Sequence, residues 1–414
     1  MTTVDQTMTD AEFDAAFAKA EELSLFFREI GPTYDLENTF AYPSIAKFKE
    51  TGLGSLCIPK LYGGQGGNLL HTSKVISELS KGDSAITLAY NMHFIMCGIM
   101  MNLMSETQNK YWLGRVCDGE LMFGPFSEQR AGFSGLADMK AVPQEGGGWK
   151  IYGTKTWGTL SEAASIITTN ATVTDKDGNI PDTFEERVNA EMLFIADWNV
   201  DADGVGDGVR IKKTWNALGM HATGTHVIEF DGFFVPEDGW VCEWRGGAFG
   251  VLEWASLMFA SIYLGMQYRV LEESRALLSK KTLGATFGAI AAADTKVANV
   301  GHIIDGVGDM ASRVELSRRV VYRTCEEVAS GYDDNWPVEL RFPYIGLAKT
   351  FVADNVMYMT RKAMSLVGGQ SFRKGAIFER LYRDSAASMF QPLNADQSCT
   401  YIGEQMLAPE ELND

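Results

Sequence analysis

A block of short β-strand patterns between two long helical blocks is the feature that most constrains the fold of this 414-residue chain. Between about residues 120 and 243, runs rich in β-branched and aromatic residues alternate with Gly, Asp and Asn turns, which is typical of a compact β-domain or barrel. The runs are WKIYGTKTW, ASIITTNATVT, AEMLFIADW, VRIKKTW and THVIEFDGFFVP. We therefore predict three domains in a helix, strand, helix order, at residues 1–119, 120–243 and 244–414.

The two flanking blocks carry clear helical signals. Thr9 and Glu12 have the spacing of a capping box, and apolar residues then recur at three- and four-residue intervals as far as Phe27. Further helical patterns in the first block lie near residues 43–52, 70–81, 85–104 and 105–118. Long amphipathic stretches, typical of a helical bundle, cover residues 253–280, 290–330 and 343–367.

Charge and composition exclude several functional classes. The net charge is −18 and the Lys and Arg residues form no dense run, so a nucleic-acid backbone would be repelled. Six cysteines lie far apart without a CxxC pair, and five histidines show no HExxH spacing, so neither a disulfide framework nor a metal centre is expected. The acidic turns TDKDGN and DADGVGDG do not match the EF-hand pattern and are predicted to be hairpin turns.

The chain is expected to be cytoplasmic and to have no membrane contact. Its first residues lack the basic region of a signal peptide, and they are too acidic for a transit peptide. The most apolar run, HFIMCGIMMNLM from His93, is about half the length of a bilayer span and favours a buried helix.

Four segments resemble known motifs, in a known order. Residues 124–141 are similar to a TEPxAGSD segment and residues 152–164 to NGxKxWITN. Residues 218–238 are similar to GMRxTxSxxxxFxxVxVP and residues 362–384 to AxQxxGGxGYxxxxPxxRxxRD. Together they resemble the acyl-CoA dehydrogenase family of flavoproteins over nearly the whole chain. The resemblance implies an N-terminal helical domain, a middle β-barrel and a C-terminal four-helix bundle.

The resemblance also implies FAD between the β-domain and the bundle. Trp157 matches the Trp that packs on the isoalloxazine ring, and Thr159 matches the Thr that reaches its N5 edge. Gly368 and Gly369 match a pair that lines the adenine–diphosphate path across a subunit interface, which implies a homodimer or homotetramer. Paired glycines allow a backbone to approach a pyrophosphate closely. The other cofactor positions that the resemblance implies are Phe126, Ser127, Ser134 and Asn394.

Two cations of the family pattern are missing. Gly284 stands where an RxxFG motif has its Arg, and His221 stands where the GMR motif has its Arg. Each loss removes a charge-assisted bond to phosphate of roughly 1.5–3 kcal/mol. FMN is therefore the alternative cofactor.

The family's catalytic glutamate is missing as well. Counting from Arg383 and Asp384, its position is Pro392, which has no proton to transfer. Some relatives carry the acid earlier, at a position that matches Ala255. Glu253 is two residues away, which is about 200° around a helix. The remaining weak candidates for a base are Asp396, His93 and His221.

Three functions remain open. The first is FAD-dependent α,β-dehydrogenation of an acyl thioester with a displaced base, with an electron-transfer flavoprotein as electron acceptor. The second is a two-component flavin monooxygenase that obtains reduced flavin from a flavin reductase and needs no glutamate. The third is a non-catalytic subunit of a hetero-oligomeric dehydrogenase.

Overall fold

The structure of the protein is a computed structural model that describes five stretches of the chain. They are residues 7–129, 136–244, 252–282, 296–332 and 338–407.

The N-terminal part is helical, as predicted. The capping box of the first helix is present: the Glu12 amide donates to Thr9 Oγ1 (3.3 Å), and the Thr9 amide donates to Glu12 Oε2 (2.8 Å). The helices here are α1 (Asp10–Glu37), α2 (Pro43–Thr51), α3 (Leu69–Gly82), α4 (Ser84–Leu103) and α5 (Glu106–Cys117). The four later helices agree with the predicted spans to within two residues.

The middle part is one sheet of nine strands within the described residues. Its path is β6-β7-β8-β3-β2-β4-β5-β9, and β1 pairs with β4. Each of the five predicted strand runs contains a strand, whereas the short β1, β2, β6 and β9 carry too few residues to produce a pattern. The strands are β1 (Met122–Phe123), β2 (Lys140–Pro143), β3 (Trp149–Gly158), β4 (Ile166–Val173), β5 (Glu191–Asp197), β6 (Val205–Gly206), β7 (Val209–Ile211), β8 (His226–Val235) and β9 (Trp240–Glu243), with α6 (Phe184–Ala190) before β5.

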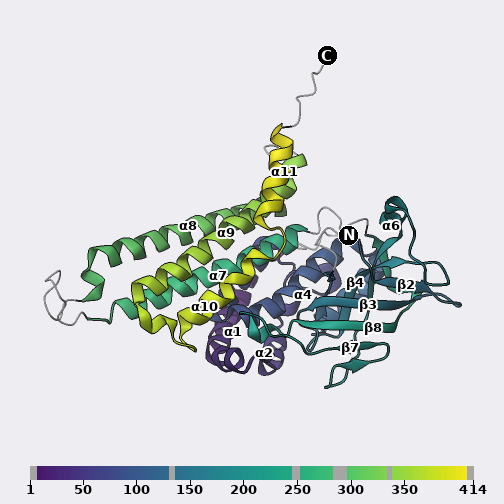
Figure 1. Ribbon diagram of the computed structural model, residues 1–414, viewed down its shortest axis with the longest axis horizontal. Coiled ribbons are helices and arrows are strands. Elements are labelled where there is room, and N and C mark those ends of the chain that lie inside the picture. Colours follow the sequence, from purple (N-terminus) through teal and green to yellow (C-terminus); the bar gives the residue numbers. More distant parts are fainter. Residues whose placement is uncertain (1–6, 130–135, 245–251, 283–295, 333–337, 408–414) are drawn as a thin grey trace, which may run out of the picture.

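The C-terminal part is helical again. Three long helices form the bundle, and α10 packs on α9 (Figure 1). Helix α11 projects from the body beside the start of α9, where the rings of Phe342 and Tyr401 lie 6.0 Å apart. Neither α10 nor α11 was predicted from periodicity. The helices are α7 (Leu252–Leu278), α8 (Gly301–Ala329), α9 (Val338–Val367), α10 (Ile377–Ser385) and α11 (Ala395–Leu407).

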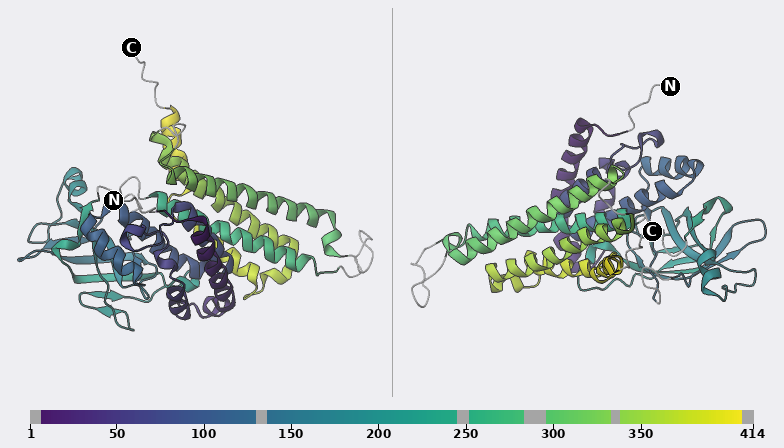
Figure 2. Two further views of the ribbon diagram at one scale, coloured as in Figure 1. Left: turned by 180° about the vertical axis from the view of Figure 1, so that it is seen from behind. Right: turned by 90° about the horizontal axis from the view of Figure 1, so that it is seen from above.

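Helix α4 lies between the sheet and the bundle and joins them into one core (Figures 1 and 2). It packs on α7, α3 and β1. By length and hydropathy it could cross a membrane, but 89% of its apolar window is buried against the rest of the protein. The apolar run from His93 is therefore a core helix, as the sequence predicts.

The packing of α4 on α7 depends on a glycine. A Cβ added at Gly98 would overlap the indole ring of Trp254, which is buried. We expect Gly98→Ala to lower the free energy of unfolding by about 1–3 kcal/mol, because the core has no room for a methyl group there. Urea denaturation measures the change.

Gly114→Ala is the matched control. Gly114 lies in α5, and a Cβ there would meet no atom within 4 Å. This substitution is expected to stabilise the protein by about 0.5–1 kcal/mol through helix propensity. Equal effects of the two substitutions would contradict the packing argument.

Candidate functional site

A cavity of about 360 Å³ lies where α4, the sheet, α7 and the segment after α10 meet. Its lining is mostly apolar. Helix α4 contributes Leu88, Met92, Ile95, Met96 and Ile99, and α7 contributes Ala255 and Phe259. The polar lining residues are Ser127, Thr159, Asn170, Thr225, Arg383 and Gln391. Such a cavity suits a ligand that is largely apolar with a few polar edges.

Two aromatic pairs form walls of the cavity. Phe126 stacks on Trp244, with ring centroids 5.2 Å apart and planes 19° apart. Trp157 meets Trp215 edge to face at 5.6 Å, and it remains 50% exposed. Flat walls with one exposed face can pack on a planar ring system.

A buried ammonium group holds the Phe126 wall in place. Lys155 on β3 is fully buried, and its Nζ donates to Phe126 O (3.0 Å), Glu128 Oε1 (2.7 Å) and Asn170 Oδ1 (2.8 Å). Burial lowers the pKa of Lys155, while the charges of Glu128 and Glu191 act in the opposite direction. Asn170 Nδ2 in turn donates to Glu191 Oε1 at 2.7 Å. The network therefore connects segment 126–128 to β3, β4 and β5, and so bridges both sides of β2 in the sheet.

A chain of hydroxyl groups leads out of the cavity. Thr223 Oγ1 donates to Met220 O (2.8 Å), and Thr225 Oγ1 donates to Thr223 Oγ1 (2.7 Å). Thr159 and Thr225 share a hydrogen bond of 2.8 Å. Because each hydroxyl has only one hydrogen, Thr159 must be the donor in that bond. The lone pairs of the Thr159 oxygen can accept a hydrogen bond from a ligand.

The segment of residues 386–392 closes one side of the cavity and is fixed by side chains of the bundle. Lys349 on α9 is 1% exposed, and its Nζ donates to Ser388 O (2.5 Å) and Gln391 O (2.6 Å). The Tyr263 hydroxyl on α7 donates to Gln391 Oε1 at 2.6 Å. Burial lowers the pKa of Lys349 to about 8, with Asp354 acting in the opposite direction.

The cavity gathers part of the predicted cofactor set. Phe126, Ser127, Trp157 and Thr159 all line it. Ser134 lies outside the described residues. Whether Phe126, Ser127, Trp157 and Thr159 contact a flavin stays a prediction.

Three other predicted cofactor residues do not line this cavity. Gly368 and Gly369 form the turn between α9 and α10, and a Cβ at either would meet no atom within 4 Å. Their predicted role across a subunit interface is left as a prediction. Asn394 Oδ1 accepts the Gln397 amide (2.9 Å) at the start of α11, which is a local helix-capping contact.

The rings of the two candidate histidines, His93 and His221, form hydrogen bonds with backbone groups of the protein. His93 is fully buried, with Nδ1 accepting from the Met122 amide (3.0 Å) and Nε2 facing Gly54 O (2.8 Å). Burial lowers the pKa of His93 to about 4. His221 faces Asp35 O (2.7 Å) and Ala217 O (3.0 Å). Neither ring lines the cavity.

The candidate acids also lie away from the cavity. Asp396 is exposed in the first turn of α11. Burial raises the pKa of Glu253 to about 7, and the opposing charge comes from Arg341 on α9. Ala255 lines the cavity in its place, as the helical rotation between the two positions requires. Pro392 also lines the cavity.

The described lining residues therefore include no Asp, Glu or His. This is the main chemical property of the site.

Sequence reasoning missed several lining residues. Trp215, Trp244 and Gln391 carry no motif signal, and tertiary packing alone brings them to the cavity. Arg383, which the motif comparison uses as an anchor, also lines the cavity. Its guanidinium is paired with Asp35 (2.7 Å) and Glu379 (2.6 Å), so its charge is compensated within the protein.

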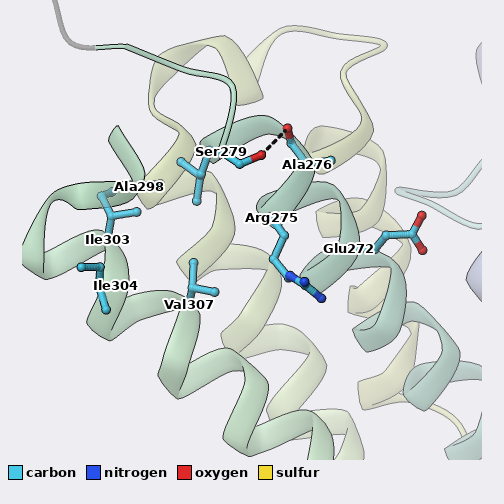
Figure 3. A pocket seen from close by; sticks show the side chains of 9 residues that line it. Glu272, Arg275, Ala276, Ser279, Ala298, Ile303, Ile304 and Val307 are labelled. Atoms are coloured by element: carbon cyan, nitrogen blue, oxygen red, sulfur yellow. Dashed lines mark hydrogen bonds between the residues drawn. The ribbon is translucent and has the colours of Figure 1, made fainter. Parts of the chain in front are cut away.

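A second hollow of about 610 Å³ lies between α7 and α8 (Figure 3). Arg275 and Glu272 project from α7, while Ile303, Ile304 and Val307 line the α8 side. None of the residues predicted to be functional lies here.

No metal site was expected, and the described residues contain no group of three or more potential ligands that could hold an ion. In each of the two acidic turns, the first Asp carboxylate accepts hydrogen bonds from backbone amides of the same turn. Asp175 Oδ1 accepts the amides of Asp177 and Asn179, both at 2.9 Å. Asp201 Oδ1 does the same for Asp203 and Val205, again at 2.9 Å. The second segment contains the hairpin of β6 and β7, as predicted, whereas the first is a turn that leads from β4 to α6, so the hairpin predicted there is wrong.

Comparison with known proteins identifies relatives over almost the whole chain. Family models match the acyl-CoA dehydrogenase N-terminal domain over residues 20–120 and its C-terminal domain over residues 250–390. YdbM of Bacillus subtilis (strain 168), an acyl-CoA dehydrogenase homologue, is 24% identical over 375 residues, which covers 88% of this chain and 90% of YdbM.

Two solved structures share the fold. Butyryl-CoA dehydrogenase from Megasphaera elsdenii has a TM-score of 0.79 at 20% identity and covers 98% of this chain and 100% of its own. TdsC from Paenibacillus sp. A11-2, a dibenzothiophene monooxygenase solved with FMN and indole, has a TM-score of 0.80 at 19% identity. That match covers 95% of this chain and 96% of TdsC. One fold thus serves a dehydrogenase and a monooxygenase.

The Lys155 network gives a stability prediction. Lys155→Met leaves Glu128 buried without its cation, and we expect the free energy of unfolding to fall by about 3–5 kcal/mol. Lys212→Met is the control, because the Lys212–Glu229 pair (2.7 Å) is partly exposed and is expected to contribute less than about 1 kcal/mol. A loss for Lys155→Met no larger than that of the control, measured by urea denaturation, would refute a central role for the network.

Lys349 gives a pH prediction. Its pKa is about 8 in the folded protein and about 10.4 in an unfolded chain, so between these values the folded state binds fewer protons. The free energy of unfolding should then rise with pH across this window, by on the order of 1–3 kcal/mol. Lys349→Met should lack this rise. Parallel stability curves for the two proteins from pH 7 to 10.5 would contradict the assignment.

Proposed function

Because the chain belongs to the acyl-CoA dehydrogenase family, we propose that it is a flavin-dependent oxidoreductase that transfers oxygen to a mostly apolar substrate in the central cavity. The observation that carries this proposal is the absence of Asp, Glu and His from the described lining residues. α,β-Dehydrogenation needs a base within hydrogen-bond reach of the α-proton. Oxygen transfer does not need one.

The cavity suits a flavin ring. The Phe126–Trp244 and Trp157–Trp215 pairs offer flat apolar faces, and Thr159 offers a polar atom at the rim. When bound in its reduced form, a flavin supplies two electrons with which O₂ yields one oxygen atom to the substrate and one molecule of water. FMN and FAD both carry this ring. FMN is favoured because Gly284 and His221 replace the two arginines expected near a diphosphate.

The residues of this chain would supply binding, orientation and exclusion of water. Met92, Ile95 and Met96 on α4 line the cavity together with the two aromatic pairs, so most of its surface is apolar. Dry, apolar walls protect reactive oxygen species from hydrolysis and proton leakage. Lys155 keeps the Phe126 wall fixed through the Phe126 carbonyl.

A specific partner follows from this proposal. The described cavity supplies no electron source, so a separate flavin reductase would deliver the reduced flavin. We also propose a homodimer or homotetramer, in which Gly368 and Gly369 of one subunit approach the cofactor of another.

Dehydrogenation of an acyl thioester by FAD is the second candidate. It is favoured by the curated relatives and by Glu253, whose pKa of about 7 suits a general base. In that case Glu253 would have to turn towards the cavity from its position facing α9, and an electron-transfer flavoprotein would accept the electrons. A non-catalytic subunit of a mixed oligomer would lack the base as well, but no observation favours it over oxygen transfer.

One experiment separates the two reactions. The purified protein is supplied with reduced FMN by a flavin reductase, in the presence of ¹⁸O₂ and a panel of aromatic sulfides and amines. Oxygen transfer predicts ¹⁸O in the product, as detected by mass spectrometry. Anaerobic mixing with acyl-CoA thioesters of several chain lengths should leave the flavin oxidised.

A Glu253→Gln variant is the control. If thioesters bleach the flavin and Glu253→Gln abolishes the bleaching, dehydrogenation is the correct reaction and oxygen transfer is excluded. Product with ¹⁸O that is unchanged in Glu253→Gln supports oxygen transfer.

A further inference from the structure

Gln391 occupies the place next to the missing glutamate. It lines the cavity beside Pro392, and its side-chain oxygen accepts the hydroxyl of Tyr263 at 2.6 Å. Tyr263 is fully buried on α7, so this bond is shielded from water. An amide whose oxygen is engaged must direct its NH₂ group elsewhere.

The NH₂ group of Gln391 is available to a ligand. Among the described residues, no hydrogen bond uses Gln391 Nε2. We infer that Gln391 Nε2 donates a hydrogen bond to a neutral acceptor oxygen of the substrate, such as a carbonyl, and so acts as a specificity-determining residue. This inference rests on the proposed function only in taking the cavity as the substrate site.

The backbone of Gln391 is fixed as firmly as its side chain. Lys349 Nζ holds the Gln391 carbonyl at 2.6 Å, and Ser256 Oγ accepts the Leu393 amide at 3.2 Å. Three bonds from α7 and α9 thus set the position of one amide. A donor fixed in this way loses little entropy when a ligand binds.

The charge of the described lining disfavours an anionic acceptor. Arg383 is the one cation among the described lining residues, and both Asp35 and Glu379 already compensate its charge. A carboxylate would lose its hydration and gain only an amide donor, which is unfavourable. A ketone, ester or thioester oxygen loses much less hydration. The substrate class is therefore an apolar molecule with one uncharged acceptor oxygen.

Three probes of similar size test the inference by isothermal titration with the full-length protein as purified. They are acetophenone (a ketone), ethylbenzene (its hydrocarbon counterpart) and benzoate (an anion). The wild-type protein should bind acetophenone about 3- to 10-fold more tightly than ethylbenzene, as expected for one net hydrogen bond, and benzoate most weakly.

Gln391→Met and Gln391→Glu should both reduce the acetophenone-to-ethylbenzene ratio to about one, because neither side chain can supply the amide donor when the carboxyl is ionised. Retained ethylbenzene affinity, within about twofold, shows that the cavity is intact. Tyr263→Phe releases the amide and should lower the ratio in part. Gln370→Met removes an exposed amide outside the cavity and should leave the ratio unchanged.

The outcomes separate this inference from the proposed reaction. A ratio that Gln391→Met and Gln391→Glu leave unchanged overturns the inference, even if ¹⁸O transfer is found. Failure to bind any probe in the wild-type protein overturns it as well. A ratio that depends on Gln391 supports it, even if the reaction proves to be dehydrogenation.

Discussion

The buried ammonium of Lys155 is the interaction on which the rest of the site depends. Two of its three bonds go to segment 126–128, at Phe126 O and Glu128 Oε1, and the third goes to Asn170 on β4. A buried charge is tolerated only when it is paired and fully hydrogen-bonded. The groups that bind the Lys155 ammonium are therefore held in fixed positions. The Phe126–Trp244 pair is held in place as well, because the Phe126 carbonyl is one of the three acceptors of the Lys155 ammonium.

The sequence predicts the elements that satisfy local rules. The capping box at Thr9 and the β-branched and aromatic runs of β3 and β8 depend on neighbours in the chain, and these elements are found where expected. Strands β1 and β9 are too short to carry a pattern, and α11 begins beyond the last motif. Their positions depend on partners far away in the sequence, which periodicity does not encode.

The same distinction applies to the site. Phe126, Trp157 and Thr159 were predicted because they lie in motifs, whereas Trp244, Trp215 and Gln391 come to the cavity only through packing. The rotation argument about Glu253 succeeded because a helix has a fixed angle per residue. The environment of His93 could not be foreseen, because Gly54 and Met122 meet its ring only in the folded chain.

The direction of the threonine chain adds to the chemical character of the cavity. Since Met220 O can only accept, the hydrogens of Thr223, Thr225 and Thr159 are all used in bonds within this chain of hydroxyl groups, and the Thr159 oxygen is left as an acceptor. The described lining residues thus offer a ligand an acceptor at Thr159 and a donor at Gln391, and they include no Asp, Glu or His that could exchange protons at neutral pH. A ring N–H, present in a reduced flavin, matches the first, and a neutral oxygen matches the second. The acceptor at Thr159, the donor at Gln391 and the missing carboxylate therefore all favour oxygen transfer. In that reaction the protein orients its ligands, and a partner supplies the electrons.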